Sequence, residues 1–241
     1  RESDPPLIFL QDGSTGFGNP SVPKAMFYFW AVWIKDGPAE PDREQSNISM
    51  HHRFENLRLA TGANPGAVGL YFETCQQAVI EDVEVDATGG FAGVNGIAGS
   101  GGATRNLKVV NGQYGIYLLG GTTQPQPTVA GAILTGQTVA NLYNDSSGPL
   151  TLVGCEMSGP GIICDTIWEA GSYRAHMSLL DCKIDLMGGD GTAVRSERNV
   201  YLGNVWVRNA AKIVAFNTGQ TVAGNPGGWA HVAEYAGGSG T

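Results

Sequence analysis

A short strand-like pattern of apolar and polar residues recurs along the chain. Six hexapeptides share it, from "FENLRL" at 54–59 to "LGNVWV" at 202–207, and "VAGAIL" at 129–134 is a weaker copy. The third position of every copy is Asn, Asp or Gly, and these residues lie 23 to 27 positions apart: Asn56, Asp82, Asn106, Gly131, Gly154, Asp181 and Asn204. A nearly constant step of this kind indicates one repeated structural unit.

The repeated unit is predicted to be one coil of a parallel β-helix. Each hexapeptide ends in alternating apolar residues, and a second strand-like piece such as "GAVGLYF" or "YGIYLL" follows after a variable, glycine-rich turn. Leucine-rich repeats need an L-x-x-L-x-L-x-x-N pattern that is absent here, and a propeller blade needs about 40 residues or more. We therefore expect an all-β fold, a single-stranded right-handed parallel β-helix (solenoid) of about seven coils.

Each column of equivalent positions in the stacked coils has a predicted role. Asn, Asp and Gly at position three tolerate left-handed backbone at least cost, which places this column at a corner of the coil. The apolar residues at positions four and six, such as Cys182 and Ile184, are expected to point inward. The residues between them point outward, where opposite charges on adjacent coils, such as Glu156 and Lys183, compensate each other.

The four cysteines do not form a metal-binding motif. They lie at positions 75, 155, 164 and 182, without a C-x-x-C pair or flanking histidines at zinc spacing, so no metal site is predicted. Cys155 and Cys182 occupy position four of adjacent coils. Their expected Cα spacing suits a disulfide, but their side chains would project in parallel. Two alternatives stay open, a disulfide and a pair of buried thiols.

The two ends of the chain depart from the repeat. Residues 1–53 contain the strand-like runs "PLIFL" and "AMFYFWAVWI", and we expect them to cap or elaborate the first coil. The β-helix itself is expected at 54–217. Residues 218–241 lose the pattern and are expected to form a C-terminal edge loop. Because the chain starts with Arg and ends in "GGSGT", we interpret it as a processed product or an excerpt of a longer polypeptide.

The charge of the chain argues against several classes of partner. Its 22 acidic and 14 basic residues give a net charge of −8, without a basic stripe for nucleic acid or an anionic membrane surface. The longest apolar run, at 25–34, is too short to span a bilayer, so membrane insertion is not expected. The 36 glycines and only 15% charged residues indicate a folded chain with many turns rather than a disordered one.

With the coils in register, residues 48–216 resemble the pectin-lyase-like, right-handed β-helix superfamily. The likeness is closest to the glycoside hydrolase family 28-related and family 55-like proteins, which carry similar N-L-x-[IV] strands, N-P-G-A-x-G-[IL] turns and Y-G-I strands. Here these match 56–59, 64–70 and 114–116. The resemblance implies a carbohydrate-handling scaffold. It implies no particular reaction, because the N-T-D, D-D and G-H-G signatures of polygalacturonases and the arginine and calcium-site signatures of pectate lyases are missing.

The best region for catalytic carboxyl groups is 164–198. Glycoside hydrolysis needs two carboxyls, roughly 5–5.5 Å apart for retention or 6.5–9.5 Å apart for inversion. The loops "CDTIWEAGSYRAH" and "GGDGTAVRSER" supply the candidate catalytic residues Asp165, Glu169, Asp190 and Glu197. The candidate substrate-binding residues are Trp168, Arg174, His176, Arg195, Arg198 and, in the outward column, Trp206. Solenoid loops are polar in any case, so a plain surface region is the competing interpretation; no cofactor is predicted.

The expected function is that of a secreted protein acting on a plant, algal or microbial polysaccharide, as a glycoside hydrolase in preference to a lyase. A lyase would need a base, for which His176 and Arg195 are candidates. The alternative is a non-catalytic β-helix: an adhesin, a surface or tail-fibre subunit, or the scaffold portion of a larger enzyme. The expected partner is a polysaccharide or oligosaccharide, with self-association or association with missing parts of a longer polypeptide as further options. The sequons at Asn47 and Asn144 fit secretion.

Overall fold

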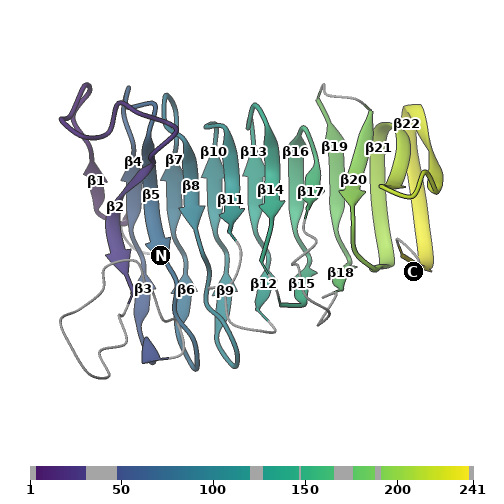
Figure 1. Ribbon diagram of the computed structural model, residues 1–241, viewed down its shortest axis with the longest axis horizontal. Helices are drawn as coiled ribbons and strands as arrows, with labels where there is room; N and C mark the ends of the chain where they lie inside the picture. Colours follow the sequence, from purple (N-terminus) through teal and green to yellow (C-terminus); the bar gives the residue numbers. More distant parts are fainter. Residues whose placement is uncertain are drawn as a thin grey trace.

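The computed structural model describes residues 4–30, 48–119, 127–146, 148–165, 176–187 and 191–238. Within these ranges the chain is built from β-strands and contains no α-helix. The strands follow one another along the long axis in chain order, with β1 at one end and β22 at the other (Figure 1). Equivalent strands of successive repeats pair in parallel. The prediction of an all-β parallel solenoid is therefore confirmed.

Each repeat supplies three strands, which form three parallel rows. The pre-corner row contains β3 (Arg53–Glu55), β6 (Val79–Glu81), β9 (Ala103–Arg105), β12 (Thr128–Ala130), β15 (Leu150–Val153), β18 (Met177–Leu180) and the start of β21 (Val200–Phe216). The post-corner row contains β1 (Leu7–Phe9), β4 (Arg58–Ala60), β7 (Glu84–Asp86), β10 (Lys108–Val110), β13 (Ile133–Thr135), β16 (Glu156–Gly159), β19 (Lys183–Leu186) and residues 206–208 of β21. The third row contains β2 (Lys24–Phe29), β5 (Ala67–Phe72), β8 (Ala92–Asn95), β11 (Tyr114–Leu118), β14 (Ala140–Asn144), β17 (Ile162–Cys164), β20 (Thr192–Ser196) and residues 212–216 of β21.

The corner between the first two rows has the backbone that the sequence predicts. All seven residues at position three have positive φ angles, from 50° at Asn106 to 65° at Gly131. Side chains also connect successive corners: the Asn106 amide donates to the Asp82 carboxylate over 3.1 Å, and the Asn204 amide donates to the Asp181 carboxylate over 2.7 Å. Asn, Asp and Gly therefore recur there because they accept left-handed backbone and, apart from Gly, bridge neighbouring coils.

The inward and outward columns also follow the predicted alternation. Positions four and six of the repeats are buried in one continuous core, apart from Leu57 of the first repeat, which is partly buried against it. In the outward column, Lys108 Nζ lies 2.9 Å from Glu84 Oε1, and Lys183 Nζ lies 2.8 Å from Glu156 Oε1. Opposite charges on adjacent strands thus meet as the pattern indicates.

The cysteines fill the core as thiols. All four are buried and unbridged, which is the second of the two alternatives left open by the sequence. Cys155 and Cys182 lie side by side on adjacent coils, where a hydrogen bond with Cys155, together with burial, raises the pKa of the Cys182 thiol. Both thiols behave as small hydrophobic side chains that continue the position-four column.

Both ends of the chain extend the solenoid. Strands β1 and β2 pair in parallel with β4 and β5, so the N-terminal segment adds strands to two rows. Instead of the predicted edge loop, Thr221–Gly237 form β22, a 17-residue strand that runs antiparallel along β21. The sequence pattern did not predict β22 because this strand pairs with β21 through backbone hydrogen bonds, which require no particular side chains. Its side chains are mostly exposed, and the apolar ones that touch the core are few: Val222, Ala230, Val232 and Tyr235.

Candidate functional site

Three carboxyl groups follow the ends of neighbouring strands in the third row. The last residues of β14, β17 and β20 are paired in register, and the next residue in each case is acidic: Asp145, Asp165 and Glu197. The Glu197 amide donates to the carbonyl of Cys164 over 2.9 Å, so the stacking continues beyond the paired strands. Each of the three acids is half-buried. We call Asp145, Asp165 and Glu197 the acidic row.

A buried arginine holds a positive charge beside the acidic row. Arg198 is only 3% exposed, and its Nε and one terminal nitrogen donate to the carbonyl oxygen of Asp165 over 3.1 and 3.0 Å. Burial lowers the pKa of Arg198, while the nearby acids of the row oppose that change. The guanidinium is therefore fixed beneath the row, where it positions the Asp165 backbone, rather than at the surface where a substrate would meet it.

Tyrosines of the neighbouring strands direct their hydroxyls toward the same place. Tyr117 of β11 and Tyr143 of β14 are paired in register and stacked, with ring centroids 5.2 Å apart and an interplanar angle of 23°. Tyr114 packs against both, at 4.7 and 5.8 Å. Burial, followed by the charge of the nearby Asp165 carboxylate, raises the pKa of the Tyr143 hydroxyl above its usual range. Because the stacked faces of Tyr117 and Tyr143 cover each other, the pair presents ring edges and hydroxyls rather than a flat platform.

The environment of Asp145 favours its protonated form. Burial raises the pKa of the Asp145 carboxyl, and the charge of Asp165 adds to this effect, whereas Arg198 opposes it. Asp145 therefore keeps its proton to a higher pH than an ordinary aspartate does. A carboxyl that holds a proton beside a second carboxyl has the properties of a general acid.

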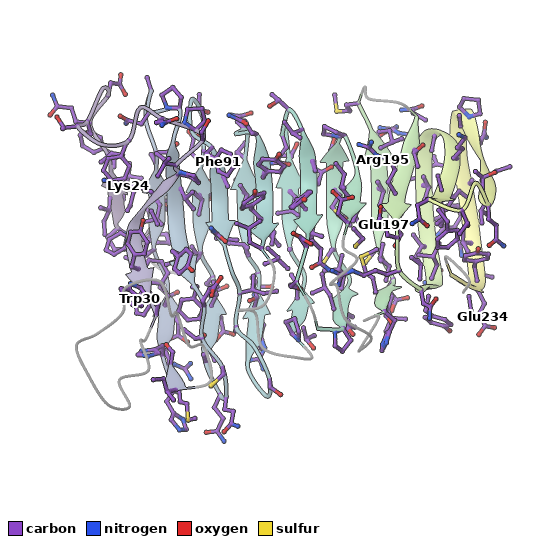
Figure 2. The ribbon with its side chains drawn as sticks, viewed as in Figure 1. Lys24, Trp30, Phe91, Arg195, Glu197 and Glu234 are labelled. Atoms are coloured by element: carbon purple, nitrogen blue, oxygen red, sulfur yellow. The ribbon has the colours of Figure 1, made fainter. Side chains whose placement is uncertain are left out.

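The structure brings together some of the residues that the sequence singled out. Asp165 and Glu197 belong to the acidic row, with Arg198 beneath it. Arg195 is exposed on β20 and precedes Glu197 by two residues, and Figure 2 shows the two side chains near each other. His176 is exposed just before β18 of the pre-corner row, and Trp206 lies in the post-corner row, so both belong to other rows. The remaining candidates lie outside the described residues: Glu169, Asp190, Trp168 and Arg174.

Sequence reasoning missed Asp145 and Tyr143. The signal that could have found Asp145 is the alignment of the third strands of each repeat. Their ends read "NLYND", "GIICD" and "AVRSE", with an acid at the same position in three consecutive coils. Tyr143 precedes that acid by two residues, on the same face of the strand.

The candidate site carries no sign of a metal centre. Within the ranges that the structure describes, no group of three or more His, Cys, Asp or Glu side chains is placed to hold a metal ion. Nor does the described part of the chain contain a helix that is long and apolar enough to cross a membrane. No family model matches the sequence, and no curated protein matches it either. The fold and the site therefore define a parallel β-solenoid with a row of carboxyl groups on one face.

Proposed function

We propose that this protein is a glycoside hydrolase that cleaves a polysaccharide at the acidic row. The observation that carries the proposal is that Asp145, whose raised pKa suits a general acid, and Asp165 directly follow Asn144 and Cys164, which are paired in register at the ends of β14 and β17. Equivalent residues on adjacent coils lie about 4.8 Å apart along the backbone, which lets two carboxyls that follow adjacent strands act on one glycosidic bond. We propose the retaining form of the two-carboxyl mechanism.

The proposed mechanism uses the two carboxyls in turn. Asp145 donates its proton to the glycosidic oxygen as the bond to the anomeric carbon breaks, and the Asp165 carboxylate bonds to that carbon. Asp145 then takes a proton from water, whose oxygen attacks the same carbon and releases Asp165. Throughout, Arg198 holds the Asp165 carbonyl, and the Tyr143 hydroxyl lies near enough to the Asp165 carboxylate for each to influence the charge of the other.

The charge of the site supports a neutral sugar as substrate. Among the described residues, the acidic row places three acids on consecutive coils, whereas Arg198 is buried and Arg195 lies exposed two residues before Glu197. A polymer of uronates would bring further negative charge to these acids and would be repelled. We therefore assign the activity to a neutral polysaccharide rather than to a pectin-like or alginate-like chain.

The finer description of the fold belongs to the same proposal. We take the solenoid to be a right-handed β-helix of about seven coils, related to the pectin-lyase-like proteins. The seven corner residues with positive φ and the nearly constant spacing between them support this number of coils. We also propose that the protein is secreted, since a polysaccharide substrate lies outside the cell. The sequon at Asn144 does not add to this argument, because the Asn144 side chain is buried.

Reducing-end release from a panel of neutral polysaccharides tests the proposal. The panel contains xylan, arabinan, galactan, mannan, and β-1,3- and β-1,4-glucans, with polygalacturonate as the charged comparison. Asp165→Asn and Asp145→Asn should each lower release by about two orders of magnitude or more, since each removes a carboxyl that the reaction needs. Proton NMR of the first product should show the anomeric configuration of the substrate.

The matched control is Asp181→Asn, the same chemical change at a corner where other repeats already carry Asn. This variant should keep the activity of the parent protein. Release by Asp165→Asn equal to that of the parent would refute the assignment of the site. A product with an unsaturated uronate end would indicate a lyase, and no release from any polymer would leave the non-catalytic alternative.

A further inference from the structure

The outer face of the post-corner row changes character toward the C-terminal end. The paired charges of Glu156 and Lys183 are followed in register by Trp206 of β21, and β22 adds Trp229 beside Arg208. Trp206 and Trp229 are 42% and 43% exposed. Large aromatic side chains that remain exposed together on one face of a sheet are typical of a binding surface.

Trp229 is fixed in place by a chain of polar contacts. The Arg208 guanidinium carbon lies 5.0 Å from the centre of the Trp229 ring, which is a cation–π distance. Arg208 is itself ion-paired with Asp185, and the Asn209 amide donates to the same carboxylate over 2.9 Å. The arginine covers one side of the indole and restrains its position.

Trp206 is restrained in a similar way. Its ring stacks on the imidazole of His231, with centroids 4.3 Å apart and an interplanar angle of 19°. A ring nitrogen of His231 lies 2.9 Å from the side-chain oxygen of Asn204. Both tryptophans are thus presented in a fixed orientation, which lowers the entropy that a ligand loses on binding.

An open groove of about 350 Å³ adjoins Trp229. Its apolar lining includes the exposed side chains of Ile133 and Trp229, and its polar lining includes Thr135, Ser158 and Asp185. Volumes of about 300–1,000 Å³ are usual for small-ligand sites. The groove lies on the post-corner row, whereas the acidic row follows the strands of the third row, so the two sites occupy different rows of the solenoid.

We propose that this groove is a second saccharide-binding site, which takes a neutral oligosaccharide and takes no part in cleavage. A sugar ring has an apolar C–H face, which suits an exposed indole, and a rim of hydroxyls, which suits the Ser158 and Thr135 hydroxyls and the Asp185 carboxylate. The charges around the groove are paired, Asp185 with Arg208 and Glu156 with Lys183. They therefore offer no net attraction to uronates or sulfated sugars. The inference stands independently of the proposed cleavage.

Isothermal titration of the 241-residue chain carrying Asp165→Asn tests the second site, since this substitution keeps the sugars intact if the parent protein cleaves them. The probes are cellohexaose, laminarihexaose, xylohexaose and maltohexaose, with hexagalacturonate as the charged comparison. At least one neutral hexasaccharide should bind, and Trp229→Ala should weaken that binding by tenfold or more. Trp206→Ala should weaken it less, because Trp206 does not line the groove.

Trp30→Ala is the matched control. Trp30 is 40% exposed, close to the value for Trp229, and lies near the opposite end of the molecule from Glu234 of β22 (Figure 2). Its replacement should leave the affinity unchanged. Equal affinities of the Trp229→Ala and Trp30→Ala proteins, or binding of none of the neutral probes at millimolar concentration, would overturn the proposal. So would sedimentation data in which Trp229→Ala dissociates a dimer that the sugars do not affect, since the groove would then be an interface between copies.

Discussion

Replacing Ile184 by Ala tests the inward register of the solenoid at one of its best-packed positions. Ile184 is 0% exposed, and the register places it between Met157 and Val207 in the inward column of the post-corner row. Removing three buried carbons from such a site costs the transfer free energy and leaves a cavity, together about 2–5 kcal/mol. For a chain of this length each kcal/mol shifts the melting midpoint by about 2–4 °C, so the expected loss is roughly 4–20 °C. Thermal unfolding followed by far-UV circular dichroism measures it.

The control for this experiment is the adjacent residue. Lys183 points outward and pairs with Glu156, and both side chains are 57% exposed. Because an exposed ion pair contributes only about 0–1 kcal/mol, Lys183→Ala should shift the midpoint by no more than about 4 °C. If Lys183→Ala lowered the melting midpoint as much as Ile184→Ala, the assignment of Ile184 to the core and Lys183 to the surface would be refuted. The register of the core that follows from this assignment would be refuted as well.

Three further predictions concern charge and backbone strain. Burial raises the pKa of Asp145, so ionisation of this carboxyl destabilises the fold as the pH rises above the range of an ordinary carboxyl. Asp145→Asn should therefore raise the midpoint of urea unfolding at neutral pH and leave it unchanged in strong acid. The hydrogen bond from Arg208 lowers the pKa of Asp185, so the ionised Asp185 carboxylate stabilises the fold at neutral pH. This contribution is lost as the pH falls through the pKa of Asp185 in the folded protein. Asp185→Asn should therefore lower the midpoint at neutral pH alone, and shifts of the same sign in both variants would contradict this reasoning. Asn106→Ala should destabilise the fold more than Asn106→Gly. Both substitutions remove the hydrogen bond to Asp82, but only alanine retains the strain of left-handed backbone, about 1–2 kcal/mol. Equal urea midpoints of the two variants would refute a strained corner.

The repeat made most of the fold accessible from sequence because each column carries one physical constraint. A corner with positive φ admits few residue types, so Asn56, Asp82 and their equivalents mark the step directly. An inward position admits only apolar side chains, which fixes the phase of each strand. Strand β22 had no such signal, since it pairs with β21 through backbone groups that every residue possesses, and its side chains face mainly solvent.

The candidate site was harder to predict than the fold because its residues come from separate coils. Asp165 and Glu197 could be named from sequence, but their stacking with Asp145 depends on the register of β14, β17 and β20 across loops of different length. Arg198 positions the Asp165 backbone because its side chain is buried, and no local sequence pattern predicts that burial. The sequence therefore located the region, whereas the pairing of strands defined which side chains meet.

The two outward faces of the solenoid use charge in opposite ways, and this contrast supports a function for the acidic row. On the post-corner face, adjacent charges alternate in sign, as Glu84 with Lys108 and Glu156 with Lys183 do, which stabilises the sheet. The third row instead ends in acids on three consecutive coils, and like charges on adjacent strands are destabilising. The buried Arg198 beneath these acids offsets part of that repulsion, but removing its guanidinium from water costs free energy as well. Glu55 and Glu81 of the pre-corner row are also paired in register, but the exposed side chains of Arg53 and Arg105 form ion pairs with them. The acidic row has a buried arginine instead, and the proposed acid–base chemistry explains this arrangement better than stability does.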